Sequence, residues 1–487
     1  RLSSGYKING SKDDAAGCAI SEKMRAQIRG LSQAQNNTAD GVSVLNTAEG
    51  AITEIQSMLT RLKELSVQAA NDVNSDDERE AIQKEIEQIN NEIDRISDQT
   101  EFNTQSLING NLSRRVYSDL QGVNQLSVSD SYTAGVYGIT VTEDARQAIA
   151  IGAGSITMSS TASITEEQAG AININGYKIS ISEGDTLDKV MGKIIDGVNI
   201  TGGSAFTVKD LNNDTAANGT DYAGYVPTAD YAGSTLVIMT NQYGSDQKMN
   251  ITCDNAELAD ILGMPQAATQ DGIYVEGSDV KAEIATGDDG KRIGFADSAI
   301  LSTKGTVITV TDVNNKEFSM DVPGNAAGTV FDDSNNDGQS AAGAGTARTI
   351  SQEVTDVGTM SIHVGANQDQ VIVIDIPAIT TYSLGTEHMN VMTQYTASRA
   401  ISTVDEAINK TNKIRSRIGA YENRFDHTTN NLEVSSENLT KSLSTMIDTD
   451  MSEEMTTYTS ETVLTQAATS ILAQANERPS QVLQLLQ

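Results

Sequence analysis

The placement of proline constrains this chain more than any other sequence feature. Of its 5 prolines, Pro227, Pro265, Pro323 and Pro377 lie in the middle of the chain, and only Pro479 lies elsewhere. Proline breaks a helix interior because it lacks an N–H donor and its ring clashes with the preceding turn. The two flanks are therefore free to form long helices, whereas the middle must fold in shorter pieces.

The N-terminal flank repeats an apolar side chain every three or four positions from Met24 to Ala69. Such a heptad-like stripe predicts a helix that packs along its length against other helices, mainly within the same molecule. The stripe consists of Met24, Ile28, Leu31, Ala34, Val42, Leu45, Ala48, Ile52, Ile55, Leu59, Leu62, Leu65 and Ala69. Polar residues 71–75 end it, and Ser75 followed by Glu78 predicts a capping box for a second helix. That helix carries isoleucines at 82, 86, 89, 93 and 96, and the Asn109–Gly110 turn signal ends the helical region.

The C-terminal flank has a similar, less regular stripe from Ile401 to Met446. Beyond it, residues 455–487 are apolar on more than one side. A helix of that kind needs partners on several faces, which a single helix at a chain terminus does not have within its own chain. The final segment therefore indicates assembly with other molecules.

Between residues 111 and 390 the pattern changes to short β-branched runs separated by Gly, Asn, Asp and Ser. The predicted strands are 138–142, 178–181, 235–240, 306–311 and 371–376, and one amphipathic helix is predicted from Thr186 to Val198. The predicted fold class is α+β: a long antiparallel helical rod, coiled-coil-like, formed by both termini, with a β-rich inserted central region. The predicted divisions are 1–110 and 391–450 for the rod, 111–390 for the insertion and 451–487 for a final helix.

The charge balance excludes several classes of partner. The formal net charge is −33, and nucleic acid binding requires clustered Lys and Arg. An anionic membrane surface is excluded on the same ground, and no apolar stretch reaches the roughly 18 residues of a membrane span. The two cysteines, Cys18 and Cys253, lie in unlike settings far apart in sequence, which argues against a disulfide framework.

Motifs for metal chemistry are weak. The histidines at 363, 388 and 427 are not spaced as a zinc-binding pair, and Glu387-His388-Met389 has no second histidine one turn later. Asp333, Asn335 and Asp337 before Gly338 match the opening of a calcium loop, but Ala344 stands where a bidentate Glu is expected. This pattern favours an acidic surface loop over a calcium site, and Asp288 to Lys291 is interpreted as a hairpin turn. No cofactor, metal or catalytic residue is predicted.

Several long motifs on both flanks resemble those of bacterial flagellin. At the N-terminal side they are RLSSGYKIN (1–9), KDDAAG (12–17), NNTADGVSVLNTAEG (36–50) and LKELSVQ (62–68). At the C-terminal side they are ENRF (422–425), SILAQAN (470–476) and VLQLL (482–486). The resemblance covers about 1–110 and 390–487. In the middle, INING (172–176) with DTL (185–187) is similar to a module found in flagellin insertions, expected over about 165–265. HVGAN (363–367) resembles the family's return into the rod.

The resemblance implies a structural subunit of the bacterial flagellar filament that is not an enzyme. It implies self-assembly with other flagellin subunits for motility, export without a cleaved signal to the extracellular flagellum, and an export chaperone at the C-terminal helix. Family members begin with a further helical stretch, which we expect to be missing before Arg1. The residues expected to pack between subunits are Val463, Leu464, Ala467, Ile471, Leu472, Val482, Leu483, Leu485 and Leu486.

The resemblance also implies a receptor surface. In many flagellins the stretch similar to 61–68 is bound by the innate receptor Toll-like receptor 5, together with a glutamate on the following helix. The matching residues here are Arg61 as a planar donor, Leu65 as an apolar anchor and Glu85 as an acceptor. Lys63 departs from the family, in which many members have Arg. Two alternatives remain: a hook–filament junction protein, and a flagellin with an adhesive or enzymatic insertion.

Overall fold

The computed structural model describes residues 1–129, 132–209, 231, 233–265, 267–270, 272–287, 290–312, 316–324, 326, 331–332, 341–342, 347–355 and 357–485. The chain divides into two compact units. Unit 1 contains residues 1–45, 361–373 and 420–487, and unit 2 contains 46–360 and 374–419. The predicted calcium loop at 333–344 falls outside the described residues, apart from 341–342. Residues 288 and 289 of the predicted turn, Leu486, and the side chains of Val482, Leu483 and Leu485 also fall outside them.

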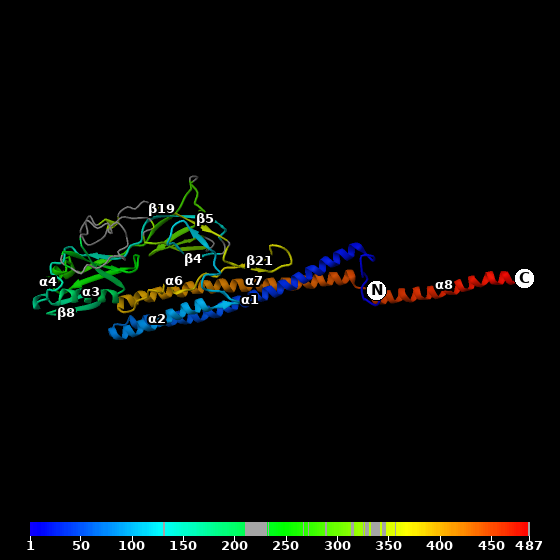
Figure 1. The fold of residues 1–487 in the computed structure, drawn as a ribbon, viewed down its shortest axis with the longest axis horizontal. Coiled ribbons are helices and arrows are strands. Elements are labelled where there is room, and N and C mark those ends of the chain that lie inside the picture. Colours follow the sequence, from blue (N-terminus) through cyan, green and yellow to red (C-terminus); the bar gives the residue numbers. More distant parts are fainter. Residues whose placement is uncertain are drawn as a thin grey trace. The chain divides into compact units, whose positions relative to one another are not determined.

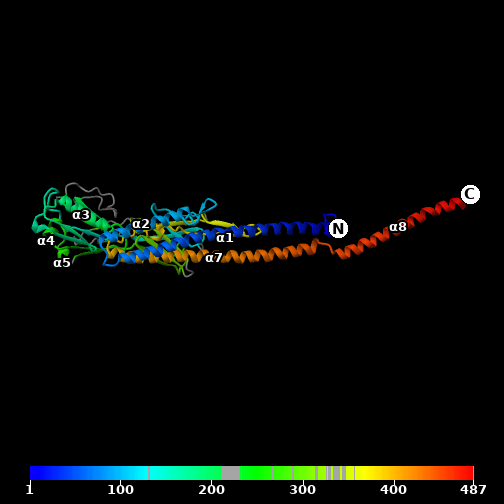
Figure 2. The same cartoon turned by 90° about the horizontal axis from the view of Figure 1, so that it is seen from below.

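The helices of unit 2 form an antiparallel bundle (Figures 1 and 2). It contains the later part of α1 (Ala15–Ala69), all of α2 (Asp76–Gln99) and the first part of α7 (Gln394–Ile447). Lys63 pairs with Asp405 and Glu49 with Arg415, so residue numbers fall along α7 as they rise along α1. The predicted stripe is the buried seam of this bundle: Ala48, Ile52, Ile55, Leu59, Leu62, Leu65 and Ala69 are all buried. The predicted helical rod with a β-rich insertion is confirmed.

In unit 1 the early part of α1 and the late part of α7 also run antiparallel. Leu31 and Ala34 form a buried cluster with Leu432. Gly41 lies against the ring of Phe425, where an added Cβ would come within 3.0 Å of the ring. The unit also contains the hairpin of β20 (Met360–His363) and β21 (Val371–Ile374), and α8 (Met451–Leu485). Pro479, the proline that lies outside the middle of the chain, is inside α8.

The insertion contains two packed regions. One of them, made from residues between 149 and 276, is built on the sheet β12-β11-β7-β8 and the sheet β6-β10-β9. Both contribute to one core with α3, which lies within two residues of the predicted helix at each end and has Thr186 as its N-cap. Their strands are β6 (Ile149–Ile151), β7 (Gly170–Ile174), β8 (Tyr177–Ile181), β9 (Gly203–Lys209), β10 (Ser234–Thr240), β11 (Lys248–Cys253) and β12 (Ile273–Glu276). The helices are η1 (Glu166–Gln168), α3 (Leu187–Ile200), α4 (Ala256–Ile261) and α5 (Ala267–Gln270).

The other packed region of the insertion is made from residues on both sides of the first, and it is built on the sheets β13-β5-β19-β3 and β14-β15-β16-β4. Its core contains the aromatic cluster of Tyr132, Tyr137, Phe295 and Phe318. The strands are β3 (Val116–Ser118), β4 (Asn124–Val128), β5 (Gly135–Glu143), β13 (Lys281–Ile284), β14 (Ile300–Lys304), β15 (Val307–Thr311), β16 (Glu317–Asp321) and β19 (Arg348–Val354). The remaining elements are β1 (Glu101–Phe102), β2 (Gln105–Ser106), β17 (Phe331–Asp332), β18 (Ala341–Ala342) and α6 (Thr381–Leu384).

The five runs predicted as strands correspond to β5, β8, β10, β15 and β21, although β21 ends at Ile374 rather than 376. Over the described residues, no helix has a stretch long and apolar enough to cross a bilayer. Cys18 on α1 and Cys253 on β11 are free thiols. Burial raises the pKa of the Cys253 thiol, which favours its unreactive protonated form.

Candidate assembly and receptor-binding surfaces

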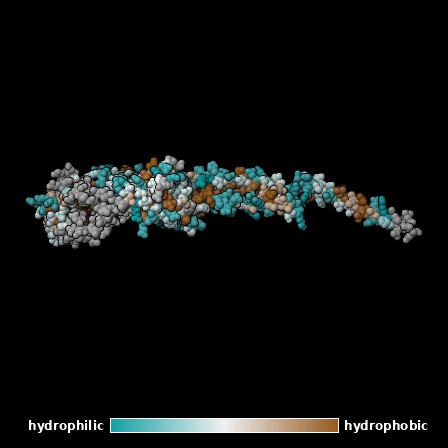
Figure 3. All heavy atoms as spheres, turned by 90° about the horizontal axis from the view of Figure 1, so that it is seen from above, coloured by the Kyte–Doolittle hydropathy of each residue, from teal (hydrophilic) through white to brown (hydrophobic). Residues whose placement is uncertain are grey.

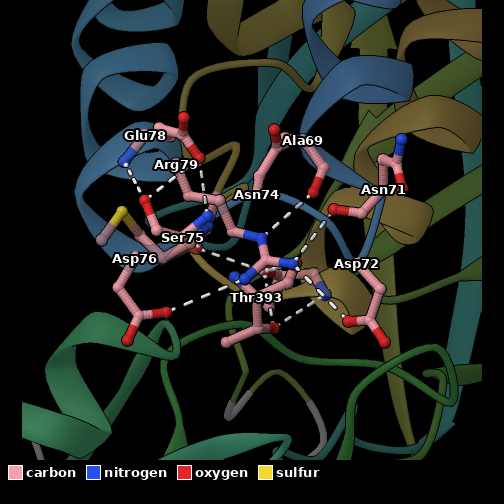
Figure 4. Close-up of polar contacts among 12 residues, drawn as sticks. Ala69, Asn71, Asp72, Asn74, Ser75, Asp76, Glu78, Arg79 and Thr393 are labelled. Atoms are coloured by element: carbon pink, nitrogen blue, oxygen red, sulfur yellow. Dashed lines mark hydrogen bonds and ion pairs between the residues drawn. The ribbon is translucent and has the colours of Figure 1, made fainter.

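The turn between α1 and α2 is held by Arg79, whose side chain points back into the turn (Figure 4). Its Nε donates to the carbonyl of Ala69 over 3.2 Å, and its Nη2 donates to the carbonyl of Asn71 over 3.2 Å. The carboxylates of Asp72 and Asp76 each lie 3.8 Å from the guanidinium. Arg79 is only 8 % exposed, and buried arginines are almost always paired in this way. The contacts fix how α2 returns along α1.

The predicted capping box begins α2 at the same turn. The Ser75 hydroxyl accepts from the Glu78 amide, and the Glu78 carboxylate accepts from the Ser75 amide over 2.8 Å. This reciprocal pair satisfies amides that the first turn of a helix leaves without a partner. It also lowers the pKa of Glu78, mainly through the backbone hydrogen bond from Ser75.

Two of the three predicted receptor residues are brought together by this arrangement. Arg61 Nε and Nη2 donate to one oxygen of Glu85 over 3.0 and 2.8 Å, and Nη1 donates to Glu64 over 3.1 Å. The Arg61 and Glu85 side chains are 48 % and 47 % exposed. Hydrogen bonding to Glu85, and then to Glu64, raises the pKa of the Arg61 guanidinium. The pair forms an exposed charged surface across α1 and α2.

The third receptor residue, Leu65, lies in a different environment. It is 1 % exposed and belongs to the buried seam of the helical bundle. In this conformation its side chain presents no apolar area to a receptor, so the accessible surface at this point is made by Arg61, Glu64 and Glu85. Lys63, two residues before Leu65, donates to Asp405 of α7 over 2.6 Å and is thereby held against α7.

Sequence reasoning missed a polar stripe on α2 that holds the segment before α7. Gln83 donates to the carbonyl of Met389 and accepts from the amide of Val391, both over 3.0 Å. Asn90 donates to the carbonyl of Thr386, and Asp94 accepts from the amide and the hydroxyl of Thr381. These three α2 residues are spaced seven and four apart beside the isoleucine stripe, as one helix face requires. Their spacing in the sequence was the signal that could have identified this polar face of α2.

The predicted assembly surface lies on α8. From Met451 to Pro479 every side chain is exposed except Glu454 and Thr462, which are partly buried. The exposed set includes Val463, Leu464, Ile471 and Leu472, at 59 to 66 %. Figure 3 shows hydrophobic side chains on the surface of this helix. Single exposed apolar residues are ordinary on a protein surface, but repeated ones along a helix indicate a surface that another molecule covers.

The three histidines weighed for metal chemistry lie on different segments of the described chain. His363 ends β20, His427 lies on α7, and His388 is 71 % exposed beside Glu387. Among the residues that the structure describes, no three His, Cys, Asp or Glu side chains are grouped to hold a metal ion.

Family comparisons agree with the arrangement of the helices. The bacterial flagellin N-terminal helical region matches residues 1–113, and the bacterial flagellin C-terminal helical region matches residues 401–486. The chain is 31 % identical to a flagellin of Salmonella typhimurium, over 100 % of this chain and 94 % of the relative. It is 29 % identical to polar flagellin A of Vibrio parahaemolyticus, over 100 % and 92 %.

Among solved structures, the chain is similar to flagellar hook associated protein-3 from Legionella pneumophila at 13 % identity and a TM-score of 0.29, covering 87 % of this chain and 98 % of that chain. This structural likeness is weak, and the family assignment rests on the sequence relatives.

Proposed function

The chain belongs to the bacterial flagellin family and is a structural subunit of the flagellar filament, and on that premise we propose that it polymerises through α8 with other copies of itself. In this proposal residues 1–110 and 391–450 form the packed helical segments and 451–487 the assembly helix. The insertion of 111–390 faces solvent. The subunit acts outside the cell, after export without a cleaved signal, and catalyses no reaction.

The exposure of apolar side chains along α8 is the observation that supports assembly most directly. A helix that leaves Leu464 and Leu472 about two-thirds exposed gains almost nothing from packing in its own chain. In a filament, each such side chain that becomes fully buried would stabilise the contact between subunits by roughly 1.5–3 kcal/mol. That gain offsets repulsion between subunits that each carry a formal charge of −33.

The test changes two apolar residues of α8 in the full-length gene of a flagellated cell. Ile471→Asp with Leu472→Asp places two carboxylates in the proposed seam, and we expect filaments to disappear in negative-stain electron microscopy. Gln466→Asp adds one carboxylate to the same exposed helix and is expected to leave filaments in place. Filaments of normal length and number in the double variant would contradict assembly through α8.

We propose that an export chaperone covers the same apolar side chains before assembly, because exposed apolar surface in the unassembled subunit favours non-specific association. If so, the double α8 variant also loses its chaperone. Pull-down of chaperone from the cytoplasm by the parent chain but not by the variant is the expected result. Equal recovery by both would place the chaperone elsewhere on the chain.

We also propose Toll-like receptor 5 as a partner of the Arg61 surface. Exposure of Arg61 and Glu85 side by side supports it, because an exposed arginine fork is a frequent hot spot in protein interfaces. The receptor would have to compete with Glu85 and Glu64 for the guanidinium, which they already bind. In this proposal Leu65, which is buried in the bundle, supports this surface from behind and does not contact the receptor.

Titration of the receptor ectodomain with the monomeric chain tests this second proposal. Arg61→Ala is expected to weaken binding about tenfold, equivalent to ~1.4 kcal/mol. Arg95→Ala is the matched control, since Arg95 is an exposed α2 arginine held by Glu92. Equal affinity of the Arg61 variant and the parent would contradict the proposed surface.

A further inference from the structure

A polar cleft of ≈ 390 Å³ lies within unit 2, between the insertion and the start of α7. One wall comes from the end of α3 and the residues that follow β10, including Asn199, Asn241 and Gln242. The opposite wall comes from Asn390 and from Arg399 and Thr403 of α7. The volume is that of a small-molecule site.

The charge of this cleft differs from that of the chain as a whole. The sequence contains 66 Asp and Glu against 33 Lys and Arg. The residues that line the cleft nevertheless include Lys248, His388 and Arg399 and no Asp or Glu. Because Glu276 neutralises Lys248, the positive charge that faces the cleft comes mainly from Arg399, and it favours an anionic ligand.

Arg399 is the cation in the cleft whose charge is paired least directly, since Asp246 and Tyr395 act on it only through longer-range electrostatics. It is partly buried, and its guanidinium makes no hydrogen bond or ion pair with any residue that the structure describes. By contrast, the neighbouring Lys248 is paired with Glu276 over 2.7 Å. Burial lowers the pKa of Arg399, because removing a charge from water is costly, and the nearby Asp246 and Tyr395 offset this cost only in part. A planar guanidinium matches a carboxylate through two parallel hydrogen bonds.

The uncharged side chains around Arg399 narrow the class of ligand. Asn199, Asn241, Gln242 and Asn390 supply amides, and Thr201 and Thr403 supply hydroxyls. Some are held in place by their own contacts: Asn390 donates to the carbonyl of Ile200 over 2.9 Å, and Gln242 accepts from Gln247 over 3.0 Å. Amides and hydroxyls that converge on one space suit a ligand with several hydroxyl groups.

We propose that this cleft binds a monosaccharide-sized carboxylate rich in hydroxyl groups, a sugar acid, with Arg399 as the carboxylate-binding residue. The amide side chains bind the sugar hydroxyls. The site is separate from α8 and from the Arg61 surface. Its test is therefore independent of the tests of the proposed assembly and receptor functions.

The test titrates the full monomeric chain with glucuronate, with glucose as the uncharged sugar and sulfate as the plain anion. Glucuronate is expected to bind at least tenfold more tightly than either, by calorimetry and by saturation-transfer NMR. Arg399→Gln is expected to weaken glucuronate binding at least tenfold. Arg95→Gln, at an exposed arginine of α2, is expected to leave it unchanged.

Asn241→Asp is a second variant, which adds a carboxylate to the cleft and so repels the ligand even if Arg399→Gln folds poorly. Its expected effect is also a weakening of tenfold or more. Glucuronate binding no tighter than that of glucose, or unchanged in folded Arg399→Gln or Asn241→Asp, would overturn the proposal. Sulfate binding as tightly as glucuronate would overturn the assignment to a sugar acid.

Discussion

The helical bundle of unit 2 and helix α8 use the same apolar residue types with opposite results. In α1, Leu59 and Leu62 are fully buried, at 0 % exposed, whereas Leu464 and Leu472 of α8 are 64 % and 66 % exposed. The apolar residues of α1 fall on one stripe, which α2 and α7 cover within the chain. Those of α8 fall on several sides, and no described residue covers them. The comparison shows that apolar content alone does not decide burial; the angular distribution of the side chains around the helix does.

Polar contacts follow the same division. The bundle is bordered by pairs between helices, such as Lys63 with Asp405 and Arg415 with Glu49, and the α1–α2 turn is fixed by Arg79. The side-chain hydrogen bonds of α8 run mostly within the helix, from threonine hydroxyls such as Thr459 to the carbonyl four residues earlier. Such bonds add little to helix stability, so a single chain gives α8 little support.

The largest expected difference between the two regions is in the cost of truncating a leucine. Leu62→Ala is expected to lower the free energy of unfolding by about 3 kcal/mol, because it leaves a cavity in a packed seam. Leu464→Ala in the monomer is expected to change it by less than about 0.5 kcal/mol, because the side chain is already in water. Urea unfolding followed by circular dichroism measures both, and equal losses would remove the distinction between the regions.

A smaller effect is expected at the turn that holds α2 in the bundle. Arg79→Met keeps most of the side-chain volume but removes the donors to the carbonyls of Ala69 and Asn71. Leaving these acceptors unpaired should lower the free energy of unfolding by about 2 kcal/mol. Arg95→Met, at an exposed arginine of the same helix, serves as the control and should cost less than about 0.5 kcal/mol. A control variant as unstable as Arg79→Met would show that the buried contacts are not the cause.

The smallest expected effect is a pH dependence at the start of α2. The pKa of Glu78 is lowered in the folded chain by the hydrogen bond from the Ser75 amide. Its contribution is therefore present above the unfolded pKa of about 4.3 and is lost as the pH falls through the lower folded pKa. Glu78→Gln should flatten the fall in stability below about pH 4 without changing α8. Urea midpoints measured at several acidic pH values test this, and parallel curves for parent and variant would contradict it.

Much of the rod could be predicted from the sequence because its signals are local and periodic. The stripe from Met24 to Ala69 and the capping box at Ser75 predict the end of α1 and the start of α2. The start of α1 at Ala15 was missed, since residues 15–23 carry few large apolar side chains. The structure shows Asp14 accepting from the amide of Gly17 over 3.0 Å, a capping contact made outside the stripe.

The candidate surfaces were less predictable because they depend on contacts distant in sequence. The apolar stripe of α1 predicts that Leu65 is buried, whereas the family resemblance predicts that it is an anchor for a receptor. In the structure Leu65 is buried. The polar stripe of Gln83, Asn90 and Asp94 needs the segment 381–391 as its partner, about 300 positions away in the chain. The cleft around Arg399 needs α3, β10 and α7 together, and no local pattern marks it.

Amide hydrogen exchange of the monomer and of the assembled filament tests the central claim most directly. In the monomer, amides of residues 52–65 in α1 should be protected and those of 455–475 in α8 should exchange rapidly. In the filament, the α8 amides should slow by on the order of 100-fold or more while those of α1 remain protected. Equal protection of α8 in both states, or rapid exchange of α8 in the filament, would contradict the assignment of its apolar surface to contacts between subunits.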